Sequence, residues 1–100
     1  MKAVASFQTS SANRYLAMLC GHFGKKVKAK CGAGVGWVQF PFGRCDMTAD
    51  EKHLEMQVSA EDQTQLRQLK HIVTSHLERF AFRENPNLDW HDASTPPPSS

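Results

Sequence analysis

Residues 53–80 read HLEMQVSAEDQTQLRQLKHIVTSHLERF, and within this stretch the spacing of the apolar side chains changes from two residues to three or four. The first part alternates with polar residues, as in a strand with one buried face, and its apolar members are Leu54, Met56, Val58 and Ala60. The second part has helical spacing, and its apolar members are Leu66, Leu69, Val73, Leu77 and Phe80. Asp62, with Gln65 three residues later, resembles a capping box. The stretch therefore predicts a strand followed by a long amphipathic helix.

The chain before residue 53 shows the same two patterns. Alternation predicts strands over residues 3–7, 27–31, 35–40 and 45–49, while helical spacing predicts a helix from Ala12 to Phe23. Three hydroxyl residues, 9–11, precede that helix as possible N-caps, and Gly24 can end it in a left-handed conformation. The second helix should continue as far as Asn85, because the residue before a proline avoids the helical region. The predicted order is β-α-β-β-β-β-α.

This order indicates an α+β fold of two layers. Four successive strands joined by short turns should pair as antiparallel neighbours, and two amphipathic helices should share one face of the sheet. The side chains expected to face the helices are Val27, Ala29, Val38, Phe40, Met47, Leu54, Met56 and Val58. The TATA-binding-protein-like fold has the same order of elements, a likeness of architecture that carries no function.

Length and composition are those of one small globular protein. A chain of 100 residues with 40% hydrophobic residues suits a single domain, expected over residues 1–90. Leu88 and Trp90 should fold back onto it, and residues 91–100, which include three consecutive prolines, should form a disordered tail. The N-terminal residues do not resemble a signal peptide, and no apolar run approaches the ~18 residues of a membrane span. We therefore expect a cytoplasmic protein without a membrane partner, whose three cysteines are reduced core residues.

Four short motifs also carry a family resemblance. They are RYL at residues 14–16, LCGHF at 19–23, FPFG at 40–43 and HLERFAFRE at 76–84. Over residues 3–90 the chain resembles a small bacterial family known as domain of unknown function 2218, and HLERFAFRE is the most specific of the motifs. The resemblance implies an auxiliary link to iron uptake, because such domains occur attached to, or encoded near, flavin-dependent siderophore-interacting proteins. It implies no catalytic residues.

One group of side chains is a candidate anion site. At 100° per residue, His76, Arg79 and Arg83 fall on one flank of the second predicted helix, while His22 and Tyr15 fall beside each other at the edge of the first. If the two flanks meet, imidazoles and guanidinium forks would suit a carboxylate or phosphate. Alternatively, these are boundary residues of the core, with the arginines paired to acids such as Glu55 or Glu84. A transition-metal site is a further alternative, although two histidines alone leave it incomplete.

A second candidate surface lies on the predicted open face of the sheet. Lys28, Lys30 and Trp37 could bind single-stranded nucleic acid by charge and stacking. The same lysines would also serve to discourage edge-to-edge pairing of strands.

These observations favour a binding protein over an enzyme. The sequence has no Ser-His-Asp order, phosphate-binding glycine loop or HExxH motif, so we expect no catalytic residue, resident metal or cofactor. The leading hypothesis is a cytosolic domain that binds an anionic small molecule or a partner such as a siderophore-interacting flavoprotein. A structural or protein-interaction module that dimerises through its open sheet face is the second hypothesis, and a single-stranded nucleic-acid binder is the third.

Overall fold

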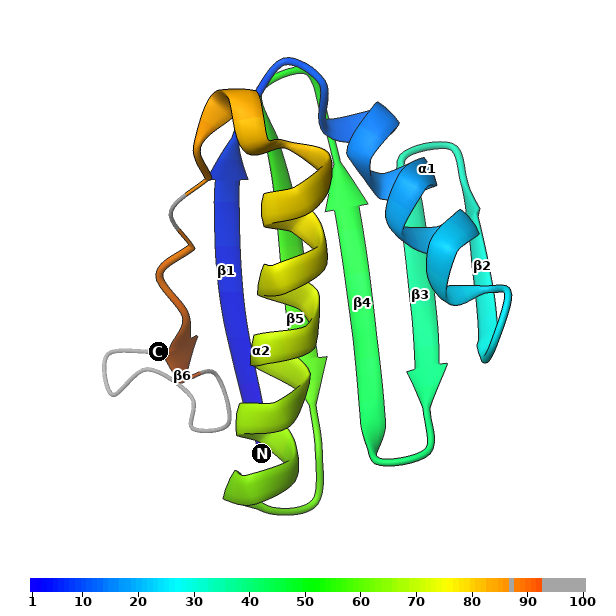
Figure 1. Ribbon diagram of the computed structural model, residues 1–100, viewed down its shortest axis with the longest axis vertical. Helices are drawn as coiled ribbons and strands as arrows, with labels where there is room; N and C mark the ends of the chain where they lie inside the picture. The colour runs from blue at the N-terminus through cyan, green and yellow to red at the C-terminus, as the bar shows by residue number, and fades with distance from the viewer. Residues whose placement is uncertain (87, 93–100) are drawn as a thin grey trace, which may run out of the picture.

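The computed structural model describes residues 1–86 and 88–92 of the chain. Its elements follow one another in the predicted order, with a 3-10 helix and a two-residue strand added near the C-terminal end (Figure 1). They are β1 (Lys2–Gln8), α1 (Ala12–Phe23), β2 (Lys28–Gly32), β3 (Val35–Phe40), β4 (Gly43–Ala49), β5 (His53–Ser59), α2 (Gln63–Phe80), the 3-10 helix η1 (Phe82–Glu84) and β6 (His91–Asp92).

The strands form one sheet in the order β2-β3-β4-β5-β1-β6, and each neighbouring pair is antiparallel. Its register places Met56 of β5 opposite Ala5 of β1 on one side and Met47 of β4 on the other. All three side chains are buried, so the alternation of each strand presents its apolar residues to the same face of the sheet. The predicted helix-facing residues all lie in or against the core, with Val27 and Ala29 only partly buried.

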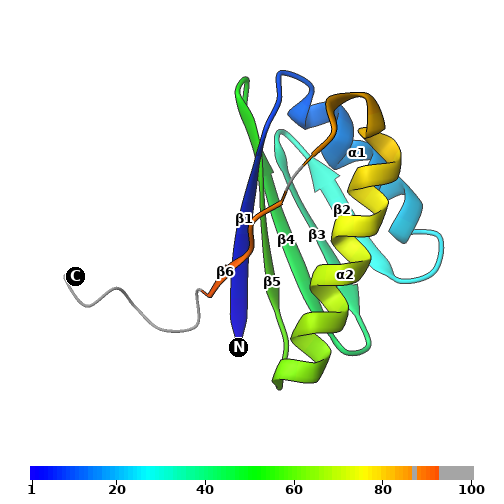
Figure 2. The same ribbon diagram turned by 60° about the vertical axis from the view of Figure 1, so that its left-hand side comes forward.

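Both helices lie on that one face of the sheet (Figure 2), which confirms the predicted two-layer α+β fold. α1 packs mainly over β2 and β3, and α2 packs over β4, β5 and β1. Between the layers, Leu19 of α1 and Leu69 and Leu77 of α2 are fully buried. None of the helices in the described part of the chain is long and apolar enough to cross a membrane.

The ends of α2 show why the helix is shorter than predicted. Asp62 caps its first turn, because its carboxylate accepts a hydrogen bond of 2.8 Å from the backbone N–H of Gln65. At the other end the helix stops at Phe80, after which Ala81 is buried and residues 82–84 form η1. The chain leaves the helical path there because Glu84 is held by hydrogen bonds to the start of α1. The continuous helix that would have carried Arg83 beside Arg79 is therefore not formed.

The C-terminal segment folds back as expected, but further than expected. Trp90 donates a hydrogen bond of 2.9 Å from Nε1 to Oγ1 of Thr74, and both Leu88 and Trp90 pack against the core. The predicted start of the tail at residue 91 is wrong, because His91 and Asp92 form β6 against β1. Without β6 the outer side of β1 would expose unpaired backbone groups. Residues 93–100 of the predicted tail lie outside the described residues.

Two smaller predictions are also corrected. Gly24 has φ −63°, so α1 ends in right-handed backbone rather than in a left-handed cap. Cys20 and Cys45 are buried as predicted, but Cys31 is exposed, because it lies on β2, the edge strand of the sheet.

Candidate functional site

The two histidines of the predicted anion site are in contact. His22 is near the C-terminal end of α1 and His76 is on α2, and the centroids of their rings lie 4.7 Å apart. The ring of Phe23 lies 4.7 Å from that of His76, and the ring of Phe80 lies 5.8 Å from that of His22. The site is therefore at the junction of the two helices, where their apolar stripes meet the solvent.

A backbone contact orients the ring of His76. Its Nδ1 lies 2.8 Å from the carbonyl oxygen of Ile72, one turn earlier on α2. Since a carbonyl oxygen only accepts, Nδ1 carries the proton and donates it. The neutral ring then keeps the lone pair of Nε2, and protonation would turn Nε2 into a second donor.

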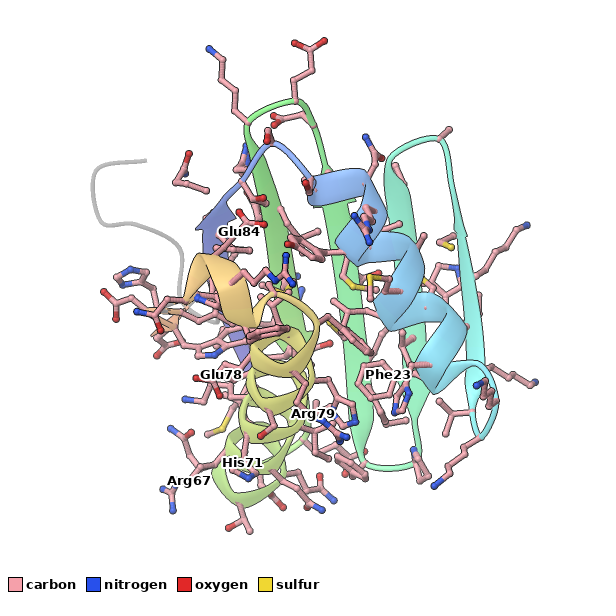
Figure 3. All side chains as sticks on the ribbon, turned by 45° about the horizontal axis from the view of Figure 1, so that its top comes forward. Phe23, Arg67, His71, Glu78, Arg79 and Glu84 are labelled. Atoms are coloured by element: carbon pink, nitrogen blue, oxygen red, sulfur yellow. The ribbon has the colours of Figure 1, made fainter. Side chains whose placement is uncertain are left out.

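Positive charge surrounds His22. Burial lowers the pKa of His22, and it is lowered further by the positive charges of His76, Lys25, Arg79 and Lys26. Figure 3 shows Arg79 on the side of α2 that faces Phe23, whereas Arg67 and Glu78 project from the other side of the helix. The charged groups of the described residues that influence His22 are thus all cationic, from both helices and from the turn after α1.

Beside the histidine pair is a cleft of about 250 Å³. Its walls are largely apolar, and its lining residues are His22, Phe23, Lys26, Val27, Phe40, Pro41, Phe42, Ile72 and His76. The ring centroids of Phe23 and Phe40 are 5.1 Å apart, with an angle of 76° between the ring planes, and those of Phe40 and Phe42 are 5.5 Å apart. The cleft therefore combines an aromatic wall with a cationic rim.

Two of the predicted site residues are engaged elsewhere. The hydroxyl of Tyr15 donates to the carboxylate of Glu84, and this hydrogen bond, followed by burial, raises the pKa of Tyr15. Tyr15 also lies seven residues before His22, which is roughly 10 Å along a helix axis. Arg83 lies on η1, with its Cζ 5.8 Å from the centroid of the Phe82 ring. The structure thus brings together His22, His76 and Arg79, and leaves Tyr15 and Arg83 outside this cluster.

The alternative pairing of these arginines with acids is not observed. Glu84 accepts hydrogen bonds from Thr9 and Tyr15 instead, and no ion pair within residues 1–86 and 88–92 involves Arg79 or Arg83. The same part of the chain has no group of three His, Cys, Asp or Glu side chains placed to hold a metal ion.

The second candidate surface has mixed charge. Lys30 and Trp37 are cross-strand partners on the open face, and Lys28 pairs with Gln39 along the same two strands. The guanidinium of Arg44 lies over the Trp37 ring at 4.9 Å, and its Nε is 3.0 Å from Oδ1 of Asp46. This region is neither uniformly basic nor apolar, so its geometry favours neither nucleic-acid binding nor dimerisation, and both stay predictions.

Sequence reasoning did not identify the aromatic wall of the cleft. The strand pattern predicts Phe40 as a core residue, and Phe42 stands out only as part of the FPFG motif. The FPFG motif is the feature of the sequence that could have indicated the position of Phe42, because Pro41 ends a strand and so places Phe42 in a turn. A further hollow of about 410 Å³ lies beyond Phe42 and includes Arg44, Glu61 and Gln65, but there the charges are of both signs.

Comparison with known proteins places the chain in a family. A family model described as "Uncharacterized protein conserved in bacteria (DUF2218)" matches residues 4–91. No curated protein sequence matches. Among solved structures, the chain is similar to the NMR structure of PA4090 from Pseudomonas aeruginosa, with 28% sequence identity and a TM-score of 0.80 over 94% of this chain and 98% of that one. The chain therefore belongs to the bacterial family DUF2218, as its four motifs indicated.

Proposed function

We propose that this protein binds a small anionic molecule with a flat apolar part in the cleft between α1 and α2. The observation that carries the proposal is the contact of His22 with His76, at 4.7 Å between ring centroids, on the rim of an aromatic cleft. The anionic group would lie at the two imidazoles and Arg79. The apolar part would lie against Phe23 and Phe42.

The size of the cleft limits the ligand. An apolar cavity of about 150 Å³ is large enough for benzene, so a cleft of about 250 Å³ suits one substituted ring. The cleft is open to solvent, and most of the affinity would come from the charged end. A charge-assisted hydrogen bond contributes roughly 1.5–3 kcal/mol, whereas a neutral ligand of the same shape would leave the cationic rim unpaired.

Benzoate and benzamide form the first test, because they share shape and differ in charge. We expect benzoate to bind more tightly, and to shift the NMR signals of the His22 and His76 ring protons and of Phe42. Equal affinities for the two compounds, or signals that respond to neither, would overturn the proposal.

Two arginine variants of α2 separate recognition from packing. Arg79→Met keeps most of the apolar stem and removes the fork, so benzoate should bind about tenfold more weakly, equivalent to about 1.4 kcal/mol. Arg67→Met is the matched control, since Arg67 is exposed on the opposite side of the same helix. A similar loss in both variants would mean that only the net charge of the protein matters.

The family resemblance adds a specific ligand class to this test. Hydroxamate- and catechol-type iron chelates carry negatively charged oxygens on small, flat groups, and one arm of such a chelate would fit the same cleft. Binding of a ferric chelate that shifts the His22 and His76 signals would support the predicted link to siderophore use. If benzoate binds and none of the ferric chelates binds, the function would be confined to smaller anions.

A further inference from the structure

We propose that Cys20 and Cys31 form a reversible intramolecular disulfide that fastens the edge strand β2 to α1, with glutathione disulfide or an equivalent low-molecular-weight disulfide as the oxidant. This inference concerns the contact between α1 and β2, outside the residues that line the cleft, and does not depend on the proposed ligand.

The two cysteine side chains meet above Gly36. Cys31 is the cross-strand partner of Gly36 in the β2–β3 ladder. A Cβ atom added to Gly36 would lie 3.0 Å from Sγ of Cys20 and 3.0 Å from Cβ of Cys31. The missing side chain of Gly36 therefore leaves the space in which both cysteines converge from different layers of the fold.

The thiol of Cys20 already contacts the cysteine strand. Its Sγ lies 3.7 Å from the carbonyl oxygen of Lys30, the residue next to Cys31. Burial, together with a hydrogen bond to the thiol of Cys31, raises the pKa of Cys20 to about 12. Cys20 is consequently a protonated thiol in the reduced protein, held against its prospective partner.

The different exposures of the two thiols assign their roles. Cys31 is exposed and Cys20 is buried, so an incoming disulfide reaches Cys31 first. β2 is the edge strand and pairs with β3, so a small shift of β2 would disturb fewer backbone hydrogen bonds than a shift of a central strand. Such freedom matters because a disulfide requires a sulfur–sulfur distance near 2.05 Å.

The reaction balances in two exchange steps. The Cys31 thiolate attacks one sulfur of glutathione disulfide, the S–S bond of the oxidant breaks, and one glutathione leaves as thiolate. The released glutathione thiolate takes the proton of Cys20. The Cys20 sulfur then attacks the Cys31 sulfur of the mixed disulfide, and the second glutathione leaves as thiolate. The two cysteines are oxidised by two electrons, and the oxidant is reduced to two molecules of glutathione. Excess glutathione reverses both steps.

The test uses the full chain in glutathione buffers of graded redox ratio, followed by acid quenching, alkylation under denaturing conditions and mass spectrometry. The reduced protein has three alkylatable cysteines, Cys20, Cys31 and Cys45. In oxidising buffer we expect one alkylated cysteine per monomer, no retained glutathione, and a Cys20–Cys31 peptide after digestion. A glutathione adduct that persists on Cys31, a dimer linked through Cys31, or three free thiols would overturn the proposal.

Variants check the assignment of each sulfur. Cys31→Ser changes an exposed side chain and should abolish the intramolecular bond, while Cys45→Ala should retain it. In the Cys20→Ala variant the reaction should stop at the mixed disulfide on Cys31. Circular dichroism should show that this variant folds. If Cys20→Ala does not fold, Cys31→Ser and Cys45→Ala still decide the question, because a bond that forms without Cys31, or that requires Cys45, contradicts the proposed pair.

Discussion

The hydroxyl of Tyr15 donates a hydrogen bond to the carboxylate of Glu84, which lies 69 residues later in the chain. Thr9 donates a second hydrogen bond of 2.7 Å to the same carboxylate. Figure 3 shows Glu84 beside the end of β1, where the chain turns into α1. These contacts give the last residue of the HLERFAFRE motif a structural role, because they join the start of α1 to the turn that follows α2.

We predict that Glu84→Ala lowers the free energy of unfolding by about 1–2 kcal/mol, because the buried hydroxyls of Thr9 and Tyr15 would lose their acceptor. Urea unfolding at neutral pH measures the change. Glu78→Ala is the control, since Glu78 is exposed on α2 and accepts no hydrogen bond from Thr9 or Tyr15, which both bond to Glu84. An equal effect of the two substitutions would show that the hydroxyl bonds contribute little.

The same carboxylate should make stability depend on acid pH. Hydrogen bonds from Tyr15 and Thr9 lower the pKa of Glu84 below its ordinary value of 4.5. The unfolded chain therefore binds the proton more readily, so this stabilisation is present above about pH 4.5 and is lost as pH falls through the lower folded pKa. Glu84→Gln should flatten the decline in that range, as measured by urea unfolding at several pH values. An unchanged slope would exclude Glu84 as its source.

Leu77→Ala should lower the free energy of unfolding by about 2–5 kcal/mol, because Leu77 belongs to the buried stripe of α2 and is 0% exposed. The control is Phe82→Ala, which removes a larger apolar side chain that is 67% exposed. Thermal or urea unfolding of both variants gives the comparison. A loss below about 1 kcal/mol for Leu77→Ala would mean that this part of the core repacks.

Binding of benzoate should take up a proton. Burial and then the charges of His76, Lys25, Arg79 and Lys26 hold the pKa of His22 below its ordinary 6.5, and a bound carboxylate would offset those charges. The pKa of His22 therefore rises on binding, and affinity should strengthen as pH falls through this range. Calorimetry in buffers of different ionisation enthalpy measures the proton, and His22→Gln should remove it. An affinity that is constant between about pH 5 and 8 would contradict this linkage.

Local patterns in the sequence predict the first five strands, the two helices, their order and the faces they bury. The alternation around Met56 and the stripe around Leu77 are local periodicities, and burial of one face follows from the period alone. The same patterns also place His22 and His76 on flanks at the edges of their stripes. The Cys31 prediction failed because composition does not show which strand lies at the edge of the sheet.

Other features depend on contacts between residues that are far apart in the chain. The contact of His22 with His76 depends on how the two helices lie across one sheet, which no spacing within either helix specifies. Arg83 left the predicted cluster because Glu84 bonds to Thr9 and Tyr15, so α2 ends early. β6 formed because β1 offered unpaired backbone groups at the sheet edge. In each case the interaction joins two segments that are far apart in the sequence. Periodicity within one segment carries no information about the other, and the two come within bonding distance only when the chain is folded.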